Sequence, residues 1–424
     1  MKRISVIGFG KIGQAIAANI LKKAIGVTAV DINTGLQLVF KKGCYETNEP
    51  GVGDILNSAY GENRLTISSD YASIKGCDAI IVAIPLLIDS QKKILDTPFL
   101  DTFKKIAPFT ENKIPIIIET SIPVGFARNN VVPAIELTGK RHGTDFLLAH
   151  SPERIKSGTM LEQLLQIPKI IGGISKEATE RSFEIYGWLF DESLLHKVES
   201  IEAAEIIKLA GMIYRDVNIA LSNQLAQFAD SKGIHFTDLI ALINTDREAG
   251  LLQPGIGVGG HCTPVYPYFM IESFKQAGLD FTLASQSRLI NDSMAEYAIS
   301  LVKDKVRTKK ALLLGLSFRP NVKEDALSVA YRLNEMLVKN GFEVAVHDAE
   351  YSPEEITTKG FTATNDIYNS SAEVIFLVTM HKEYYHLDFE KLCGLGARFF
   401  IDGRNSINRN EVEKAGISYM GIGR

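Results

Sequence analysis

The sequence predicts an α/β protein in which two doubly wound domains are joined by a long central helix. Strand, turn and helix patterns alternate near the start of the chain and again in its last third, and an uninterrupted helical pattern lies between them. A chain of 424 residues also exceeds the usual size of one domain. We therefore expect three regions, which comprise residues 1–198, 199–303 and 304–424.

Composition excludes several classes of protein. Hydrophobic residues make up 46% of the chain and charged residues 23%, as in ordinary globular proteins. The net charge is -4 without a basic run, so we expect no nucleic-acid partner and no membrane partner. The four cysteines, at positions 44, 77, 262 and 393, are too dispersed to indicate a disulfide framework or a metal site. The longest apolar run, residues 79–88, is too short to span a membrane, and we expect a cytoplasmic protein.

The opening segment has the clearest local pattern. Two strand-like apolar runs and a helix-forming stretch surround a glycine turn, at residues 4–7, 27–30 and 14–23. Gly8 makes the tight turn, Gly10 lets the backbone approach a pyrophosphate, and Gly13 lets the helix pack close to the strand. Asp31 ends the second run, where a carboxylate binds a ribose 2'-hydroxyl and repels a 2'-phosphate. The pattern predicts a Rossmann-like domain that binds NAD rather than NADP.

Further strands follow as buried apolar runs at residues 79–84, 114–118 and 147–150. In a doubly wound sheet, ligands bind along the edge where the parallel strands end. Glu153 and Arg154 come directly after the last of these runs, so they are candidates for that edge. From their spacing alone, it is equally well supported that Glu153 and Arg154 contact a substrate and that they form a solvated pair on the surface.

A long helix is predicted over residues 200–232, because this stretch has no proline, apolar residues at helical spacing, and Gly233 as a stop signal. Such a helix would be roughly 50 Å long, enough to link domains and to offer a face to a second subunit. Lys208, Met212 and Arg215 fall on one stripe of it. A lysine that extends along apolar surface and a methionine that fills a core remain the ordinary alternatives for the first two.

A glycine-rich loop at residues 255–260 precedes His261 and Cys262. So many glycines indicate close backbone approach, either by a ligand or by tight packing. The thiolate of Cys262 would be stabilised at a helix start and by a cation such as Lys208. A reactive nucleophile and an inert cysteine remain equally supported, and we favour a packing role for His261.

The last third again alternates strands and helices, with strands expected at residues 311–315, 343–348, 373–378 and 398–402 and a helix at 328–339. It lacks a GxGxxG turn. Instead, Arg319, Lys323 and Arg404 follow strand ends, where a doubly wound sheet binds anionic ligands. This favours a second nucleotide rather than a second NAD.

Taken in order, these motifs resemble those of the nucleotide-sugar 6-dehydrogenases over essentially the whole chain. The matching segments are GFGKIG with Asp31, ETSIPVG from Glu119, SPER from Ser151, Lys208 with YRDVN from Tyr214, QPGIGVGGHC from Gln253, and DGRN from Asp402. The SPER and GVGGHC segments look most like the UDP-N-acetylmannosamine or a related UDP-N-acetylhexosamine branch. The UDP-glucose branch is the nearest competitor.

The resemblance implies an NAD-dependent, four-electron oxidation of a sugar C6 alcohol to a carboxylate, in polysaccharide biosynthesis. Cys262 would be the nucleophile, and the substrate would pass through a thiohemiacetal and a thioester. Lys208 would stabilise the oxyanion or transfer a proton. Glu153, with Ser121 or Thr120, would hold the hydrolytic water. The family also implies a homodimer through the central helix.

The same resemblance implies two binding sites. Residues 1–198 would bind NAD, through Gly8, Gly10, Lys11, Ile12, Gly13, Asp31 and Ser121. The UDP-sugar would be bound by residues 304–424 together with residues from the first two regions. The binding residues would be Arg154, Ile155, Lys208, Met212, Arg215, Gly255, Gly257, Gly259, Arg319 and Arg404.

Three positions depart from the family pattern. Met212 stands where the family usually has an asparagine that supports the oxyanion, and Tyr266 stands where it usually has an aspartate. Residues 323–329 lack the arginine that commonly precedes a Ser-Pro pair. These departures motivate two alternatives, an enzyme that stops at the aldehyde and a binder of nucleotide sugars that performs no chemistry.

Overall fold

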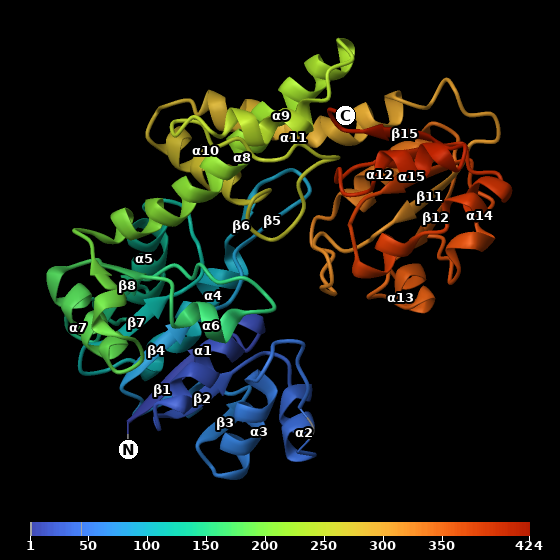
Figure 1. Cartoon of the computed structure of the whole chain (residues 1–424). Coiled ribbons are helices and arrows are strands. Elements are labelled where there is room, and N and C mark those ends of the chain that lie inside the picture. The colour runs from blue at the N-terminus through green and yellow to red at the C-terminus, as the bar shows by residue number, and fades with distance from the viewer. Residues whose placement is uncertain (1, 44) are drawn as a thin grey trace. The chain divides into compact units, whose positions relative to one another are not determined.

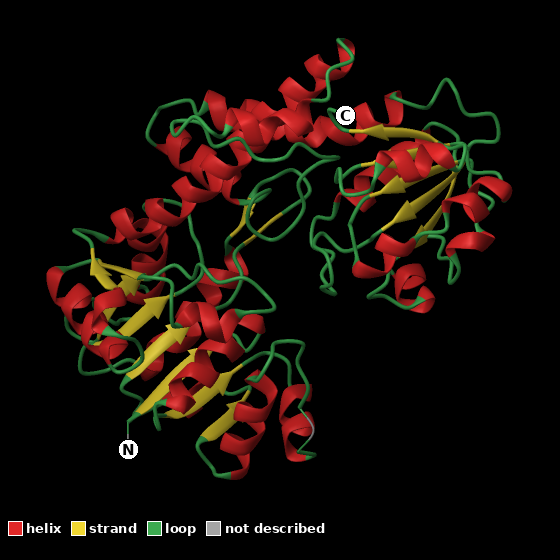
Figure 2. Ribbon diagram, in the orientation of Figure 1, coloured by secondary structure: helices red, strands yellow, loops and turns green. Residues whose placement is uncertain are grey.

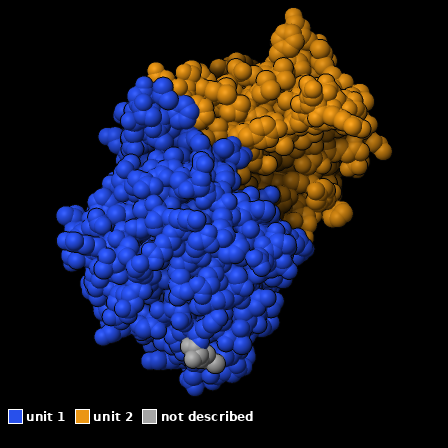
Figure 3. All heavy atoms as spheres, turned by 90° about the vertical axis from the view of Figure 1, so that its left-hand side faces the viewer, with its two compact units in different colours: residues 1–211, 268–279 blue, residues 212–267, 280–424 orange. Residues whose placement is uncertain are grey.

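The computed structural model describes residues 2–43 and 45–424, so Cys44 lies outside the described residues. The chain forms two compact units (Figure 3). The first comprises Met1–Gly211 and Tyr268–Leu279, and the second comprises Met212–Pro267 and Asp280–Arg424. Each unit has its own sheet and its own hydrophobic core.

The first unit is built on an eight-stranded sheet with the order β10-β9-β8-β7-β4-β1-β2-β3 (Figures 1 and 2). Its strands are β1 (Arg3–Ile7), β2 (Gly26–Val30), β3 (Leu65–Ser68), β4 (Ala79–Val82), β7 (Ile114–Ile118), β8 (Phe146–His150), β9 (Lys169–Gly173) and β10 (Leu195–Lys197). Neighbouring strands are parallel except β8 and β9, which are antiparallel. A short hairpin of β5 (Leu87–Ile88) and β6 (Ile94–Leu95) follows β4.

The strands of this sheet are apolar along most of their length because helices cover both faces. The helices of this unit are α1 (Lys11–Lys22), α2 (Gly35–Lys41), α3 (Val52–Gly61), α4 (Thr97–Ile106), α5 (Val132–Glu136), α6 (Met160–Leu164) and α7 (Lys176–Gly187). Ile4 of β1, Ile81 of β4 and Ile117 of β7 share one core with Ala15 and Ile16 of α1. The strands expected from the apolar runs are confirmed, although β4 ends at Val82, two residues earlier than predicted.

The predicted central helix is confirmed as α8 (Ile201–Ser231), which has 31 residues and is roughly 46 Å long at 1.5 Å per residue. Residues 201–211 of α8 belong to the first unit and residues 212–231 to the second. The helix stops before Gly233, which has a φ of 67° and so adopts the left-handed conformation that terminates helices. The neighbouring helices are α9 (Phe236–Ile243), α10 (Tyr266–Gln276) and α11 (Thr282–Ser300).

The second unit contains a five-stranded parallel sheet with the order β12-β11-β13-β14-β15 (Figure 1). Its strands are β11 (Lys310–Leu314), β12 (Glu343–His347), β13 (Val374–Leu377), β14 (Phe399–Asp402) and β15 (Ser418–Gly421). Its helices are α12 (Val329–Lys339), α13 (Pro353–Thr358), α14 (Phe389–Gly394) and α15 (Arg409–Lys414). The two faces carry separate cores, as expected for a doubly wound sheet, and the predicted fold class is confirmed.

Within residues 2–43 and 45–424, the model contains no helix with the length and apolar character needed to cross a membrane.

Candidate active site

The glycine turn after β1 has three positions with three different surroundings. Gly8 has a φ of 88°, and a Cβ placed there would lie 2.7 Å from Cγ2 of Ile84. A Cβ at Gly13 would lie 1.9 Å from the carbonyl oxygen of Gly8, so the helix could not pack this close with any other residue. A Cβ at Gly10 would meet no described atom within 4 Å. Gly8 and Gly13 therefore fill packing roles, while Gly10 leaves open space beside the backbone.

The start of α1 suits a phosphate group. Gly10 precedes the helix, and in the described part of the chain no side chain caps its first turn. The backbone N–H groups and the positive end of the helix dipole attract an anion there. Lys11 and Ile12 are the first two residues of that turn.

Asp31 lies at the end of β2, as predicted, and supports the turn. Its Oδ2 accepts a hydrogen bond from the backbone N–H of Phe9 at 2.6 Å, and its Oδ1 accepts one from Asn33 at 2.8 Å. Ile32 follows it and is 82% exposed, an apolar side chain beside Asp31 that could contact an adenine ring and that sequence analysis missed. The open space at Gly10, the uncapped helix and this acid fit NAD.

We predict that Gly10→Ala and Gly13→Ala have different effects. Gly10→Ala should weaken NADH binding by about tenfold or more, since its Cβ fills the space that the pyrophosphate needs, and it should leave thermal stability unchanged. Gly13→Ala should lower the free energy of unfolding by about 2 kcal/mol or more, because its Cβ overlaps the Gly8 carbonyl. Fluorescence titration with NADH and thermal unfolding measure the two effects. Equal effects of the two variants on NADH binding and on thermal stability would contradict the separate roles assigned to Gly10 and Gly13.

Glu153 is buried at the same edge of the sheet, only 8% exposed. Its Oε1 accepts hydrogen bonds from the backbone N–H groups of Arg154 and Ile155 at 2.7 and 3.1 Å, and its Oε2 lies 2.7 Å from Nζ of Lys169. This burial excludes a solvated surface pair. The guanidinium of Arg154 donates to the carbonyl oxygen of Pro168, so this side chain is also anchored.

The electrostatic environment of Glu153 comes from two lysines. Burial alone would raise the pKa of Glu153, but the ammonium of Lys169, its hydrogen bond and the charge of Lys208 outweigh burial and lower it. Lys208 is itself only 8% exposed on α8. Ser121 is buried in the loop after β7. The first unit therefore contains Glu153, Lys208 and Ser121 together with the NAD fingerprint.

Cys262 lies in the second unit, where its thiol is half-buried. Its carbonyl oxygen accepts the backbone N–H groups of Val265 and Tyr266 at 3.0 and 2.9 Å, so Cys262 stands at the turn that opens α10. Cys262 thus lies four residues before the first residue of α10, near the predicted helix start. The positive end of a helix dipole stabilises a thiolate in such a position.

The glycine-rich loop before Cys262 owes its composition to tight packing. Added Cβ atoms would lie 3.0 Å from Cγ2 of Val329 at Gly257, 2.8 Å from Cβ of Phe318 at Gly259 and 3.0 Å from the Phe318 ring at Gly260. The sequence offered two explanations for these glycines, a bound ligand and tight packing. The structure shows tight packing on one side of the loop.

Two asparagines of α8 anchor the approach to this loop, and sequence analysis had assigned them no such role. Asn218 accepts the N–H of Leu252 at 2.8 Å and donates to the carbonyl oxygen of Gly250 at 2.6 Å. Asn223 accepts the N–H of Gly255 at 2.9 Å. The sequence did contain a signal for this role, because these asparagines are polar residues on the buried side of a largely apolar helix.

Arg404 lies against the same loop in the second unit. Its Nε donates to the carbonyl oxygen of Val378 at 2.5 Å, and a Cβ on Gly255 would lie 3.6 Å from its Nη1. Burial lowers the pKa of Arg404 to about 10, and the nearby Asp402 offsets burial only in part. A partly buried cation whose charge is incompletely compensated is suited to an anionic ligand.

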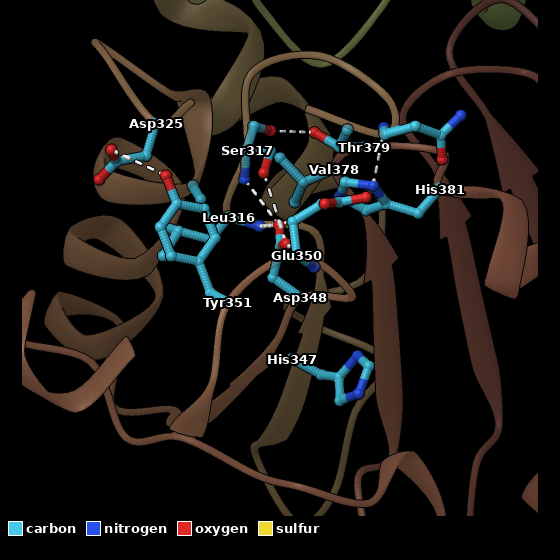
Figure 4. Close-up of polar contacts among 12 residues, drawn as sticks. Leu316, Ser317, Asp325, His347, Asp348, Glu350, Tyr351, Val378, Thr379 and His381 are labelled. Carbon is cyan, nitrogen blue, oxygen red and sulfur yellow. Dashed lines mark hydrogen bonds and ion pairs between the residues drawn. The ribbon is translucent and has the colours of Figure 1, made fainter. Parts of the chain in front are cut away.

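Arg319 and Phe318 lie on the loop after β11, and the buried side chains of Asp348 and His381 hold this loop, as Figure 4 shows for Leu316 and Ser317. Oδ2 of Asp348 accepts the N–H groups of Leu316 and Ser317 at 2.6 and 2.7 Å. His381 accepts the N–H of Asn321 on Nδ1 at 3.0 Å, which leaves its Nε2–H to donate to Asp348 at 3.1 Å. Lys323, in contrast, pairs with Glu355.

The other predicted substrate residues are also in the second unit. Met212 is half-buried and Arg215 is exposed on α8, and Tyr266 is the first residue of α10. The predicted site residues thus fall into two groups, one in each unit.

The first unit is Rossmann-like and carries a dinucleotide fingerprint, and the second is doubly wound and has a thiol and a partly buried arginine beside one glycine loop. Together they define a nucleotide-linked oxidoreductase. Models of the three domains of one family match the chain in succession: the NAD binding domain at residues 2–190, the central domain at 202–293 and the UDP binding domain at 312–409. The chain belongs to the UDP-glucose/GDP-mannose dehydrogenase family.

Individual relatives agree with this assignment. The UDP-N-acetyl-D-mannosamine dehydrogenase of Methanocaldococcus jannaschii is 29% identical, over 100% of this chain and 96% of that protein. The UDP-N-acetyl-D-glucosamine 6-dehydrogenase of Pseudomonas aeruginosa is 27% identical, over 93% of this chain and 94% of that protein. The solved structure of the UDP-D-ManNAc dehydrogenase from Pyrococcus horikoshii superposes with a TM-score of 0.89 at 27% identity, covering 100% and 99% of the two chains.

These findings confirm the predicted family, its class as NAD-dependent dehydrogenases of nucleotide sugars, and NAD as the cofactor. The roles of individual residues remain predictions.

Proposed function

We propose that this protein oxidises the C6 alcohol of a UDP-N-acetylhexosamine, of the ManNAc or GlcNAc type, to a carboxylate. The observation that carries the proposal is a half-buried thiol, Cys262, that directly follows a glycine loop whose first residue, Gly255, lies against the partly buried Arg404. The relatives named above are dehydrogenases of such sugars, which supports the substrate class.

The first oxidation converts the alcohol to an aldehyde. Bound NAD accepts one hydride in each of the two oxidations. Lys208 stabilises the alkoxide as the C6 hydroxyl loses its proton. Lys208 is buried and carries a flexible ammonium, which suits both charge stabilisation and proton transfer.

The second oxidation proceeds on the enzyme. The thiolate of Cys262 adds to the aldehyde carbon, the resulting thiohemiacetal loses a hydride and a proton, and a thioester remains. Water then adds to the thioester, the thiol leaves, and the carboxylate is released. Glu153, with Ser121 or Thr120, holds this water.

Arginine side chains and backbone groups bind the substrate. Arg404 and Arg319 contact the UDP moiety from the second unit, with Arg215 of α8. Arg154 and Ile155 contribute from the first unit. The glycine loop offers its backbone to the sugar through Gly255, Gly257 and Gly259.

The stoichiometry of NADH tests this function. Purified protein is incubated with NAD and, in turn, with UDP-ManNAc, UDP-GlcNAc, UDP-GalNAc and UDP-glucose. Two NADH per sugar and a carboxylate product support the proposal. One NADH with an aldehyde that can be trapped by hydroxylamine supports the alternative that Met212 and Tyr266 motivate.

We also propose that the protein is a homodimer through α8. Tyr214, Leu221 and Phe228 recur every seven residues on this helix and are 64%, 49% and 61% exposed, an apolar stripe open to a partner.

The stripe gives a prediction. Leu221→Asp should convert the dimer to a monomer, because a buried, unpaired carboxylate would replace apolar contact at the interface. Light scattering coupled to size exclusion measures the mass. Leu137→Asp, at an 83% exposed leucine outside the stripe, is the matched control and should not change it. Dimers in both variants would contradict the proposed interface.

A further inference from the structure

A buried row of charges at the edge of the first sheet is centred on Lys169. This lysine is 3% exposed, and its Nζ lies 2.7 Å from Oε2 of Glu119 and 2.7 Å from Oε2 of Glu153. The hydroxyl of Tyr186 donates to the other oxygen of Glu119. We call these four residues the acid–lysine cluster.

Strand topology brings the cluster together. Glu119 follows β7, and Glu153 lies three residues after the end of the neighbouring strand β8. β9 runs antiparallel to β8 with His150 opposite Gly172, and continuing this register places Lys169 opposite Glu153. The first residue of β9 therefore reaches the edge where β7 and β8 end.

The charges of the cluster do not balance, because two carboxyl groups share one ammonium away from water. Burial, with the charge of Glu153, raises the pKa of Glu119 to about 7 against the opposing effect of Lys169. The same lysine lowers the pKa of Glu153. Near neutral pH, the cluster thus accepts a proton on Glu119 and leaves Glu153 ionised.

Glu153 connects the cluster to the reaction. Through Oε1 it fixes the backbone of Arg154 and Ile155, and its charge interacts with that of Lys208. The signs alternate from Lys169 through Glu153 to Lys208, so each group stabilises the charge of the next.

We propose that Lys169 is a positioning residue for the reaction, which keeps Glu153 ionised and in place and thereby holds the turn of Arg154 and the charge of Lys208. This inference rests on the proposed function. The remaining titratable groups around the cluster do not ionise near neutral pH. Burial lowers the pKa of His150 to about 4, and burial with the charge of Glu119 raises that of Tyr186 well above its ordinary value.

Lys169→Met tests the proposal through the pH dependence of kcat/KM. Without the ammonium, two buried carboxyl groups face each other and one must hold a proton, so the pKa of Glu153 rises. The acid limb should move up by about three to four pH units, into the neutral range, as for other fully buried carboxyl groups, and kcat/KM at pH 7 should fall severalfold. NADH affinity should stay unchanged. Lys113→Met, which removes an exposed pair with Glu177, is the matched control.

Glu119→Gln is the second variant, and it decides the matter if Lys169→Met does not fold. It replaces the acid that holds the proton by a neutral amide and leaves Lys169 to Glu153 alone, so the acid limb should stay in place while the titration of Glu119 near pH 7 disappears. A folded Lys169→Met with a wild-type pH profile, or an acid limb that moves to higher pH in Glu119→Gln, would overturn the proposal.

Infrared spectra of substrate-free protein at pH 7 separate this inference from the proposed function. In the double variant that combines Lys169→Met with Glu119→Gln, Glu153 is the one acid left in the cluster and should hold a proton. The spectrum of the double variant should therefore contain a protonated carboxyl band that the spectrum of Glu119→Gln alone lacks. Absence of the band overturns the role of Lys169. A wild type that forms no NADH from any UDP-sugar, with the band present, overturns the proposed function instead.

Discussion

Cys262→Ser is expected to lower the rate of carboxylate formation by about a thousandfold or more, the largest effect predicted for this protein. A hydroxyl in place of the thiolate adds poorly to the aldehyde and leaves poorly from an ester, so both halves of the covalent step are lost. Removing the nucleophile of an enzyme that forms a covalent intermediate typically costs many orders of magnitude in kcat. NADH formation measured against uronate formation follows the two steps separately.

The partial reaction makes this prediction specific. Lys208 and the NAD fingerprint are intact in Cys262→Ser, so the first oxidation should persist and should yield up to one NADH and an aldehyde. Cys393→Ser is the matched control, because Cys393 is another half-buried thiol of the same unit, on α14. Two NADH per sugar at the wild-type rate in Cys262→Ser would disprove the covalent role.

Sequence predicted much of the fold because its strands and helices carry strong local patterns. The apolar runs of β4 and β7 are buried on both faces, and the proline-free stretch of α8 has a clear stop at Gly233. The three glycines of the first turn could be given separate roles from spacing alone. Their surroundings match these roles, with contacts at Gly8 and Gly13 and open space at Gly10.

The contacts that position the site could not be predicted in the same way, because they depend on register between segments distant in sequence. Lys169 meets Glu153 only because β9 is antiparallel to β8. Asp348 and His381 hold the Phe318 loop through a buried network with no local pattern (Figure 4). For the glycines before Cys262, sequence indicated close approach but could not distinguish packing from ligand contact.

The departures at Met212 and Tyr266 increase the importance of Lys208. A thioether cannot donate a hydrogen bond to an oxyanion, so the charge that develops on the C6 oxygen must be stabilised by another group. Lys208 lies one turn before Met212 on α8, and its ammonium is buried at the end of the alternating row of charges. In the proposed mechanism, this cation compensates for the neutral donor that the family pattern has in place of Met212, because charge-assisted hydrogen bonds are about twice as strong.

Lys208→Met should therefore reduce kcat about a hundredfold to a thousandfold, which corresponds to about 3 to 4 kcal/mol of transition-state stabilisation. Both hydride transfers should slow, since each passes through an oxyanion, whereas Cys262→Ser affects mainly the second. NADH affinity should be retained, and Lys197→Met, at an exposed lysine paired with Glu180, should leave kcat unchanged. Stopped-flow absorbance of NADH resolves the two transfers. If Lys208→Met slowed only the release of product, its ammonium would act in hydrolysis of the thioester and not on the C6 oxygen.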